Sequence, residues 1–329
     1  MIVKSKTGYE ISMRAYVEDV LNLYRKEVKT CVTPAKLNLF TIEGGLEKID
    51  PVAFHSIVAK LLYLGKRGRP DILLPIQFLC TRVKAPTVED QRKLERVLGY
   101  LKLTKSWTRM FDNSEFNRVM TFIDASFAMH NDGKGQSGCM VFLGNTLVHA
   151  TCRKQKIVTR DSTESELVAL SDYVVEGGLV EEFLMDLGTL MDVDLIDTPL
   201  LIFQDNKSTI TLVETNGGKP RNKYMRVRIA YVAERLGTGE VYVKYVHTSK
   251  MIADLLTKPL QGEAFYRFAQ AALGRLYAES NRGAKEIRPR DGDTLVEVMQ
   301  ALTCSQPQSH KKSKENQNGS DASTLKELG

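Results

Sequence analysis

Three short β-rich segments follow one another between residues 119 and 151, and they constrain the fold more than any other part of the chain. They are Val119–Asp124, Ser137–Leu143 and Thr146–Thr151, and the Gly144-Asn145 pair between the last two is typical of a tight hairpin turn. Two more strand-like segments, Pro199–Asp205 and Gly239–Val246, alternate with helical patterns. This order predicts an α/β fold with a mixed five-stranded sheet and helices on both faces.

The longest helical pattern starts within residues 161–172. Apolar residues from Leu167 onward recur at i, i+3 and i+7, which predicts a helix with one buried face that continues to about Leu187. Ser162 or Thr163 can cap this helix. Thr163 and Glu166 also match a capping box, so Glu166 is either a capping residue or a functional carboxylate at the edge of the buried face.

Residues 1–110 contain mainly helical patterns. The clearest are Ala15–Tyr24, Ala53–Leu64 and Val88–Leu103. The outer face of the last pattern is basic, which fits either ordinary solvation or contact with backbone phosphates. We therefore expect a mainly helical subdomain before the five-stranded sheet.

Beyond residue 277 the composition changes to Ser, Gln, Asn, Lys and Gly. Residues 278–329 offer too little apolar area to offset the entropy lost on ordering, so we expect a disordered tail. Eight basic and eight acidic residues balance in this segment, so the net charge of +6 belongs to residues 1–277. A basic ordered part is compatible with a polyanionic partner.

The cysteine usage argues against several classes of protein. The five cysteines form no CxxC pair and are odd in number, which disfavours a zinc site or a disulfide framework and favours a reducing compartment. No apolar stretch approaches the length of a membrane span. We expect an intracellular protein, cytoplasmic and/or nuclear, with no membrane partner and no small-molecule cofactor; the sequence indicates no particular oligomeric state.

Four acidic residues occur where predicted strands end or helices begin. Asp124 and Asp205 end strands, Glu166 lies in the first turn of the long helix, and Asp254 lies on a short helix after the fifth strand. Sites in open α/β sheets form beyond the carboxyl ends of strands. Carboxylates brought together there repel unless cations neutralise them, and oxygen ligands suit Mg²⁺ or Mn²⁺. Each acid alone also fits a helix cap or a solvated end of an element, and Asp205-Asn206 could cap the next helix.

Several of these segments carry a resemblance. Phe122–Ser126, Lys154-Gln155, Ser162–Leu170, Asp205–Ser208 and Ala253–Leu260 resemble the ribonuclease H domain of Ty1/copia-type retrotransposon Pol polyproteins. Tyr9–Thr104 is similar to the reverse transcriptase thumb and connection that precede it there, including Arg69-Pro-Asp-Ile72. The resemblance covers roughly residues 5–275, a C-terminal part of such polyproteins.

The resemblance implies a domain division and a fold. Residues 1–110 would be a thumb/connection-like helical remnant, 118–262 a ribonuclease H-like domain, 263–277 a C-terminal helix and 278–329 the disordered tail. The expected fold is thus ribonuclease H-like, with a mixed five-stranded sheet flanked by helices and preceded by a mainly helical subdomain.

The resemblance also implies an activity. It is Mg²⁺-dependent endoribonuclease action on the RNA strand of RNA–DNA hybrids, with two metal ions, Mn²⁺ being a possible substitute. The implied catalytic and metal-binding residues are Asp124, Glu166, Asp205 and Asp254. We expect substrate contacts from Arg153, Lys154, Gln155, Asn206, Ser208 and His247. For His247 the alternatives are a structural role at a strand end and assistance in product release.

Three departures from the family pattern leave a second reading open. No Tyr-x-Asp-Asp occurs, so we expect no polymerase activity; Asp161 stands where a second serine is usual; and Lys223–Arg228 differs from a Lys-His-Ile-Asp-Ile-Arg type run. The alternative function is therefore that of a catalytically inactive nucleic-acid-binding remnant of a copia-type polyprotein. Integrases use the order Asp, Asp, Glu, which the order of acids here argues against.

Overall fold

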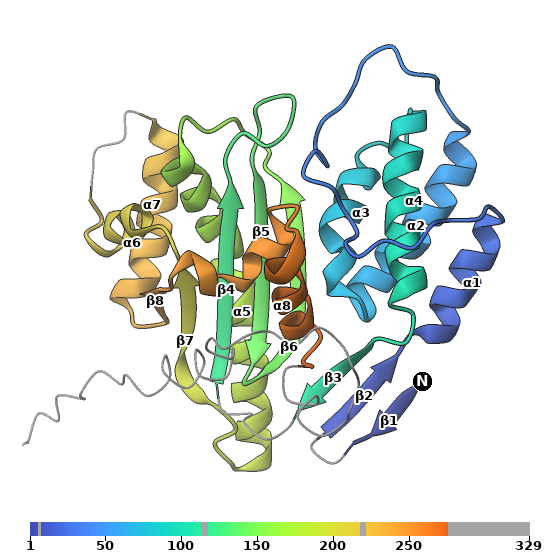
Figure 1. The fold of residues 1–329 in the computed structure, drawn as a ribbon. Coiled ribbons are helices and arrows are strands. Elements are labelled where there is room, and N and C mark those ends of the chain that lie inside the picture. The colour runs from blue at the N-terminus through green and yellow to red at the C-terminus, as the bar shows by residue number, and fades with distance from the viewer. Residues whose placement is uncertain (6–7, 113–117, 218–221, 276–329) are drawn as a thin grey trace, which may run out of the picture.

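The computed structural model describes residues 1–5, 8–112, 118–217 and 222–275, and a mixed five-stranded sheet forms its centre (Figure 1). The strand order is β6-β5-β4-β7-β8. Their bounds are β4 Arg118–Ser126, β5 Gln136–Leu143, β6 Thr146–Lys154, β7 Asp197–Gln204 and β8 Val241–Tyr245. Strands β4, β5 and β6 are antiparallel, whereas β7 runs parallel to β4 and β8 parallel to β7. The α/β class predicted from the sequence is confirmed.

Helices cover both faces of this sheet. They are α5 Ser162–Met191, α6 Lys207–Glu214, α7 Lys223–Gly237 and α8 Gly262–Ala272, with short 3₁₀ helices η2 Thr248–Lys250 and η3 Ile252–Leu256. Because side chains alternate along a strand, Val119 and Ile123 of β4 pack with α5 and α7, while Met120 and Phe122 pack on the opposite side. In Figure 1 the orange segment containing η3 and α8 crosses in front of the sheet, and α5 lies behind it.

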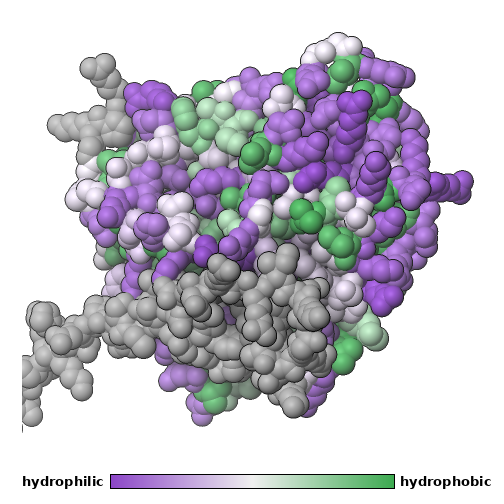
Figure 2. All heavy atoms as spheres, in the orientation of Figure 1, coloured by the Kyte–Doolittle hydropathy of each residue, from purple (hydrophilic) through white to green (hydrophobic). Residues whose placement is uncertain are grey.

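The first part of the chain combines helices with a small sheet. The helices are α1 Arg14–Tyr24, α2 Pro51–Arg67, η1 Pro70–Ile72, α3 Leu73–Cys80 and α4 Val88–Leu103. A three-stranded antiparallel sheet joins β1 Ile2–Lys4, β2 Gly8–Ser12 and β3 Thr108–Asp112. Strands β1 and β3 were not expected from the sequence. Hydrophilic residues dominate the surface over α1, α2 and α4 in Figure 2, as amphipathic helices require.

The helical part and the five-stranded sheet share one hydrophobic core. Leu61 of α2 and Leu98 of α4 belong to the same buried cluster as Phe122 and Phe142 of the sheet. Phe265 of α8 belongs to it as well. Helix α8 therefore packs inside the shared core, and it spans Gly262–Ala272 rather than the expected 263–277. The predicted disordered tail, residues 278–329, lies outside the described residues.

A buried polar network holds the start of η1 against the end of α4. The guanidinium of Arg69 donates to Asp71 at 2.7 Å and to the carbonyl of Thr104 at 3.0 Å, and the Tyr100 hydroxyl donates to Asp71 at 2.6 Å. Arg69 is 1% exposed, so its charge is buried together with that of Asp71. The Arg69-Pro-Asp-Ile72 motif thus has a structural role here.

The start of α5 differs from the prediction. Asp161, not Ser162 or Thr163, is the N-cap, and its side chain accepts a hydrogen bond from the Glu164 amide at 2.8 Å. The prediction of a capping box formed by Thr163 and Glu166 is therefore wrong, and the Glu166 carboxylate does not cap the helix. The helix also continues past the expected end near Leu187.

Gly177 explains how α5 lies so close to the sheet. A Cβ at Gly177 would lie 2.2 Å from Thr121 Oγ1 on β4, so glycine permits this approach.

Within the described ranges, no helix is both long enough and apolar enough to cross a bilayer.

Candidate metal centre

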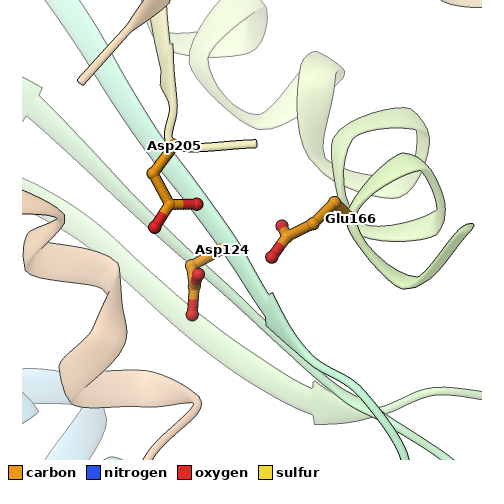
Figure 3. Close-up of side chains that lie close together, drawn as sticks. All are labelled: Asp124, Glu166 and Asp205. Atoms are coloured by element: carbon orange, nitrogen blue, oxygen red, sulfur yellow. The ribbon is translucent and has the colours of Figure 1, made fainter. Parts of the chain in front are cut away.

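The structure brings three of the four predicted acids together. Asp124, Glu166 and Asp205 each offer one oxygen within 4.8 Å of the others, and the three carboxylates point toward one another (Figure 3). Neighbouring parallel strands explain two of these positions: the register pairs Phe122 of β4 with Phe203 of β7. Asp124 and Asp205, each two residues further on, therefore lie at the same edge of the sheet.

Glu166 reaches this edge from α5, which packs across β4. Its side chain is 5% exposed, and Gln204 Nε2 donates to its Oε2 at 3.3 Å. Glu164 lies in the same turn, yet its carboxylate accepts from Arg160 Nε at 2.7 Å. The structure thus assigns the two glutamates different partners and places only Glu166 in the cluster.

Asp254 lies beside Asp124 but is not one of the three converging carboxylates. It pairs with Lys258, whose Nζ is 2.6 Å from Asp254 Oδ1 and 3.5 Å from Asp124 Oδ1. Gly138 of β5 pairs with Asp124 across the sheet. A Cβ there would lie 2.8 Å from the Cβ of Leu256, so glycine lets η3 carry Asp254 close to the strand.

Three neighbouring side chains hold the carboxylates in place. The Thr257 hydroxyl donates to Asp124 Oδ2, and Thr257 is fully buried. The Thr248 hydroxyl donates to Asp205 Oδ2 at 2.7 Å. Together with the Gln204 amide on Glu166, these contacts restrict the rotation of each acid.

The electrostatics of the cluster favour bound cations or protons. Burial raises the pKa of Asp124 well above its ordinary value, and the charge of Asp254 raises it further. Burial, followed by the charges of Asp124 and Asp205, likewise raises the pKa of Glu166. Burial raises the pKa of Asp254, although Lys258 opposes this shift. Negative charge is therefore costly here unless a cation compensates it.

The donor set fits a hard divalent cation. Only carboxylate oxygens converge at this point, and among the described residues no second group of three acidic, histidine or cysteine side chains meets in this way. Oxygen ligands of this kind are preferred by Mg²⁺ and Mn²⁺, whereas zinc sites usually contain nitrogen or sulfur. The cluster is accordingly a candidate metal centre.

The six expected substrate-contact residues have varied surroundings. Gln155 is buried and donates to Ser137 Oγ and to the carbonyl of Ser165, both at 2.9 Å, so it ties β6 to α5. Lys154 pairs with Asp132 at 2.8 Å. Asn206 caps α6, and His247 caps η2 and contacts Ser249. Two are exposed without such a capping or packing role: Arg153 and Ser208.

Lys258 and Thr257 were not predicted as part of the site. Both belong to the Ala253–Leu260 motif, whose chemistry was assigned to Asp254 alone. The available signal was the i, i+4 spacing of Asp254 and Lys258, which places an acid and a base on one side of a helical turn.

Comparisons with known proteins show relatives among transposon proteins, while no family model matches the chain. It is 29% identical over 269 residues to the retrovirus-related Pol polyprotein from transposon RE1 of Arabidopsis thaliana, covering 80% of this chain and 18% of the relative. The truncated transposon Ty1-A Gag-Pol polyprotein of Saccharomyces cerevisiae is 25% identical over 64% of this chain and 18% of its own. The chain thus spans about a fifth of the length of these polyproteins.

The solved structures that resemble this one are more distant in sequence. LC11-RNase H1, isolated from compost, has a TM-score of 0.32 and 15% identity over 43% of this chain and 93% of its own. A foamy viral protease-reverse transcriptase in complex with RNA/DNA hybrid has a TM-score of 0.43 and 12% identity, over 75% of this chain and 28% of its own. The sheet order and flanking helices described above are those of the predicted ribonuclease H-like fold.

A shorter relative is matched over most of its own length. An uncharacterized mitochondrial protein of Arabidopsis thaliana is 33% identical over 168 residues, which cover 50% of this chain and 69% of that protein. The homologues of this chain are thus Ty1/copia-type retrotransposon Pol polyproteins, as its sequence motifs predicted.

Proposed function

We propose that this chain is a ribonuclease H-type endonuclease that uses Mg²⁺ to hydrolyse the RNA strand of RNA–DNA hybrids. One observation carries the proposal: Asp124, Glu166 and Asp205 converge at one edge of the sheet, with Asp254 beside them, in a chain whose homologues are Pol polyproteins. Structural acids that only cap helices have no reason to converge in a buried cluster, because their mutual repulsion destabilises it.

Asp124, Glu166 and Asp205 would hold the divalent cation, and Asp254 would complete the acidic set. When bound, Mg²⁺ or Mn²⁺ supplies Lewis-acid activation of a water molecule and stabilises the charge on the phosphate. The chain itself fixes the ligands, through the hydrogen bonds of Thr257 and Thr248 to two of the aspartates. Such supporting bonds orient the ligands of a metal site.

Substrate binding would rely on basic groups at the end of β6. Arg153 and Lys154 are the last residues of β6. Strand β6 pairs with β5, and β5 lies next to β4, the strand that carries Asp124. Guanidinium and ammonium groups bind phosphate oxygens independently of base sequence. In the free protein Lys154 is held by Asp132, so binding of a phosphate there would replace this ion pair.

A second candidate is a nucleic-acid-binding protein without catalysis. It is favoured by the altered Lys223–Arg228 run, in which residues 224–227 depart from the family pattern. Arg228, which matches that pattern, donates to Asp172 at 2.6 Å and joins α7 to α5. The exposed Lys223 and Arg226 in the same run could still contact phosphates.

The two candidates are separated by incubating the purified chain with an RNA–DNA hybrid labelled on both strands, with Mg²⁺ or with EDTA. The proposed function predicts that the RNA strand is cut only with Mg²⁺, and that the DNA strand and duplex DNA stay intact. Binding of the hybrid without cutting would support the second candidate. In a parallel assay we expect no extension of a DNA primer, because the chain contains no Tyr-x-Asp-Asp.

A further inference from the structure

We propose that Lys258 is a resident cation of the acidic site, which neutralises Asp124 and Asp254 in the metal-free protein and must leave when a cation binds between them. The inference rests on the proposed function and deepens it, because it assigns a regulatory role to a residue of that same site. It divides the acidic set into one side held by an ammonium group and one side open to metal.

The distances define the first side. Lys258 Nζ lies 2.6 Å from Asp254 Oδ1 and 3.5 Å from Asp124 Oδ1, so one ammonium group contacts a carboxylate from η3 and another from β4. Both carboxylates are buried: the side chain of Asp124 is 0% exposed and that of Asp254 is 8% exposed. Two buried carboxylates this close together require a compensating charge.

The second side of Asp124 faces different groups. Its carboxylate also belongs to the group that meets Glu166 and Asp205, with ligand oxygens within 4.8 Å of one another. Asp124 is thus shared between a pair that contains the Lys258 ammonium and a trio that consists of carboxylates. A first divalent cation has an all-oxygen site at the trio, whereas a cation at the Asp124–Asp254 pair competes with Lys258.

The position of the Lys258 side chain allows its ammonium group to move out of the acidic site. It is 35% exposed, whereas its two partners are almost fully buried, so the ammonium enters the site from the surface of the protein. A lysine has a flexible four-carbon stem and a strongly hydrated head, and both favour exchange with water. Lys258 follows Asp254 by four residues, which keeps the ammonium close to the site after displacement.

The main test variant is Lys258→Gln, which keeps a polar side chain of similar length and removes the charge. Lys258→Arg keeps the charge and serves as the conservative variant. Lys105→Gln is the matched control, because Lys105 also pairs with a carboxylate, that of Glu18 at 3.3 Å, but on an exposed surface of the helical part. Mg²⁺ binding is measured by titration calorimetry, and stability by urea denaturation with and without Mg²⁺.

We expect Lys258→Gln to bind Mg²⁺ at least about tenfold more tightly than the wild type at the weaker site, because close charge pairs couple by more than this factor. Without metal the variant should unfold at a lower urea concentration, and Mg²⁺ should remove the difference. A variant that folds only in Mg²⁺ would be the same result in a stronger form. Lys258→Arg and Lys105→Gln should bind Mg²⁺ as the wild type does.

Equal or weaker Mg²⁺ binding by Lys258→Gln, in a wild type that does bind Mg²⁺, overturns the role of Lys258 and leaves the proposed function standing. If neither protein binds Mg²⁺, both the inference and the proposed function fail. Binding by Lys258→Gln alone would support the inference directly, since removal of the ammonium would then have opened the site.

Discussion

Glu164 and Glu166 lie in the same turn of α5 but have opposite surroundings. Arg160 binds the carboxylate of Glu164 at 2.7 Å, whereas the carboxylate of Glu166 is buried and meets those of Asp124 and Asp205. Residues two positions apart on a helix are separated by a rotation of about 200°, so one helical turn cannot direct both acids into a single site. The pair therefore provides an internal comparison within one structural element.

Replacing Glu166 with Gln should lower the single-turnover rate of hybrid cleavage by at least about 100-fold, because it removes a metal ligand. Replacing Glu164 with Gln should leave the rate within about a factor of two. It should reduce the free energy of unfolding by about 0.3–1 kcal/mol, since it removes a negative charge near a helix N-terminus. The opposite ranking of the two rates would show that Glu166 is not the ligand.

The adjacent glycines of α5 should respond oppositely to substitution by alanine. A Cβ at Gly177 would lie 2.2 Å from Thr121 Oγ1 and 2.8 Å from Leu200 Cδ1, whereas nothing lies within 4 Å of a Cβ at Gly178. We expect Gly177→Ala to destabilise the protein by about 1–3 kcal/mol through overpacking. Gly178→Ala should stabilise it by about 0.5–1 kcal/mol, because alanine favours the helix. Urea denaturation of both variants tests this, and equal effects would contradict the close approach of α5 to β4.

Glu181 should make stability depend on pH. It lies half-buried on α5 near β7, where burial raises its pKa from 4.5 to about 7 although Arg118 opposes the shift. Because the folded-state pKa is the higher one, the stabilisation is fully present below the unfolded-state pKa and is lost as the pH rises through the folded-state pKa.

Glu181→Gln removes this dependence. The full shift corresponds to about 3 kcal/mol, which solvent screening at this half-exposed position reduces to about 1 kcal/mol. The variant should therefore be about 1 kcal/mol more stable than the wild type at about pH 8 and should gain nothing near pH 4. Glu182→Gln, at the exposed neighbouring position, is the control. A constant difference between the variant and the wild type across this range would refute the assignment to Glu181.

Much of the fold could be predicted because its signals are local. The hairpin turn at Gly144-Asn145 and the alternating segments around it predict β5 and β6, which the structure confirms. Strands β1 and β3 were missed because they are short. They also lack the alternation of buried and exposed residues that is typical of a sheet with one buried face. The N-cap of α5 was misplaced because Asp161, Ser162 and Thr163 are all good capping residues, and only the backbone distinguishes them.

The candidate site was predictable where topology alone determines it. Parallel neighbouring strands end at the same edge, so the approach of Asp124 and Asp205 follows from the element order. The contact of Lys258 with Asp124 was not predictable, because it depends on how η3 packs against β5 across Gly138. The burial of Gln155 between β6 and α5 likewise depends on tertiary packing, which no sequence period encodes.

The central claim is that the carboxylate cluster holds a metal ion for cutting RNA in a hybrid, and Asp124 tests it most directly because it is shared by both sides of the site. The measurement compares single-turnover cleavage of a labelled RNA–DNA hybrid in Mg²⁺ by the wild type and by Asp124→Asn, with circular dichroism as a check of folding. We predict cutting of the RNA strand by the wild type and no detectable cutting by a folded Asp124→Asn protein. Cleavage at an unchanged rate by that variant would contradict the account.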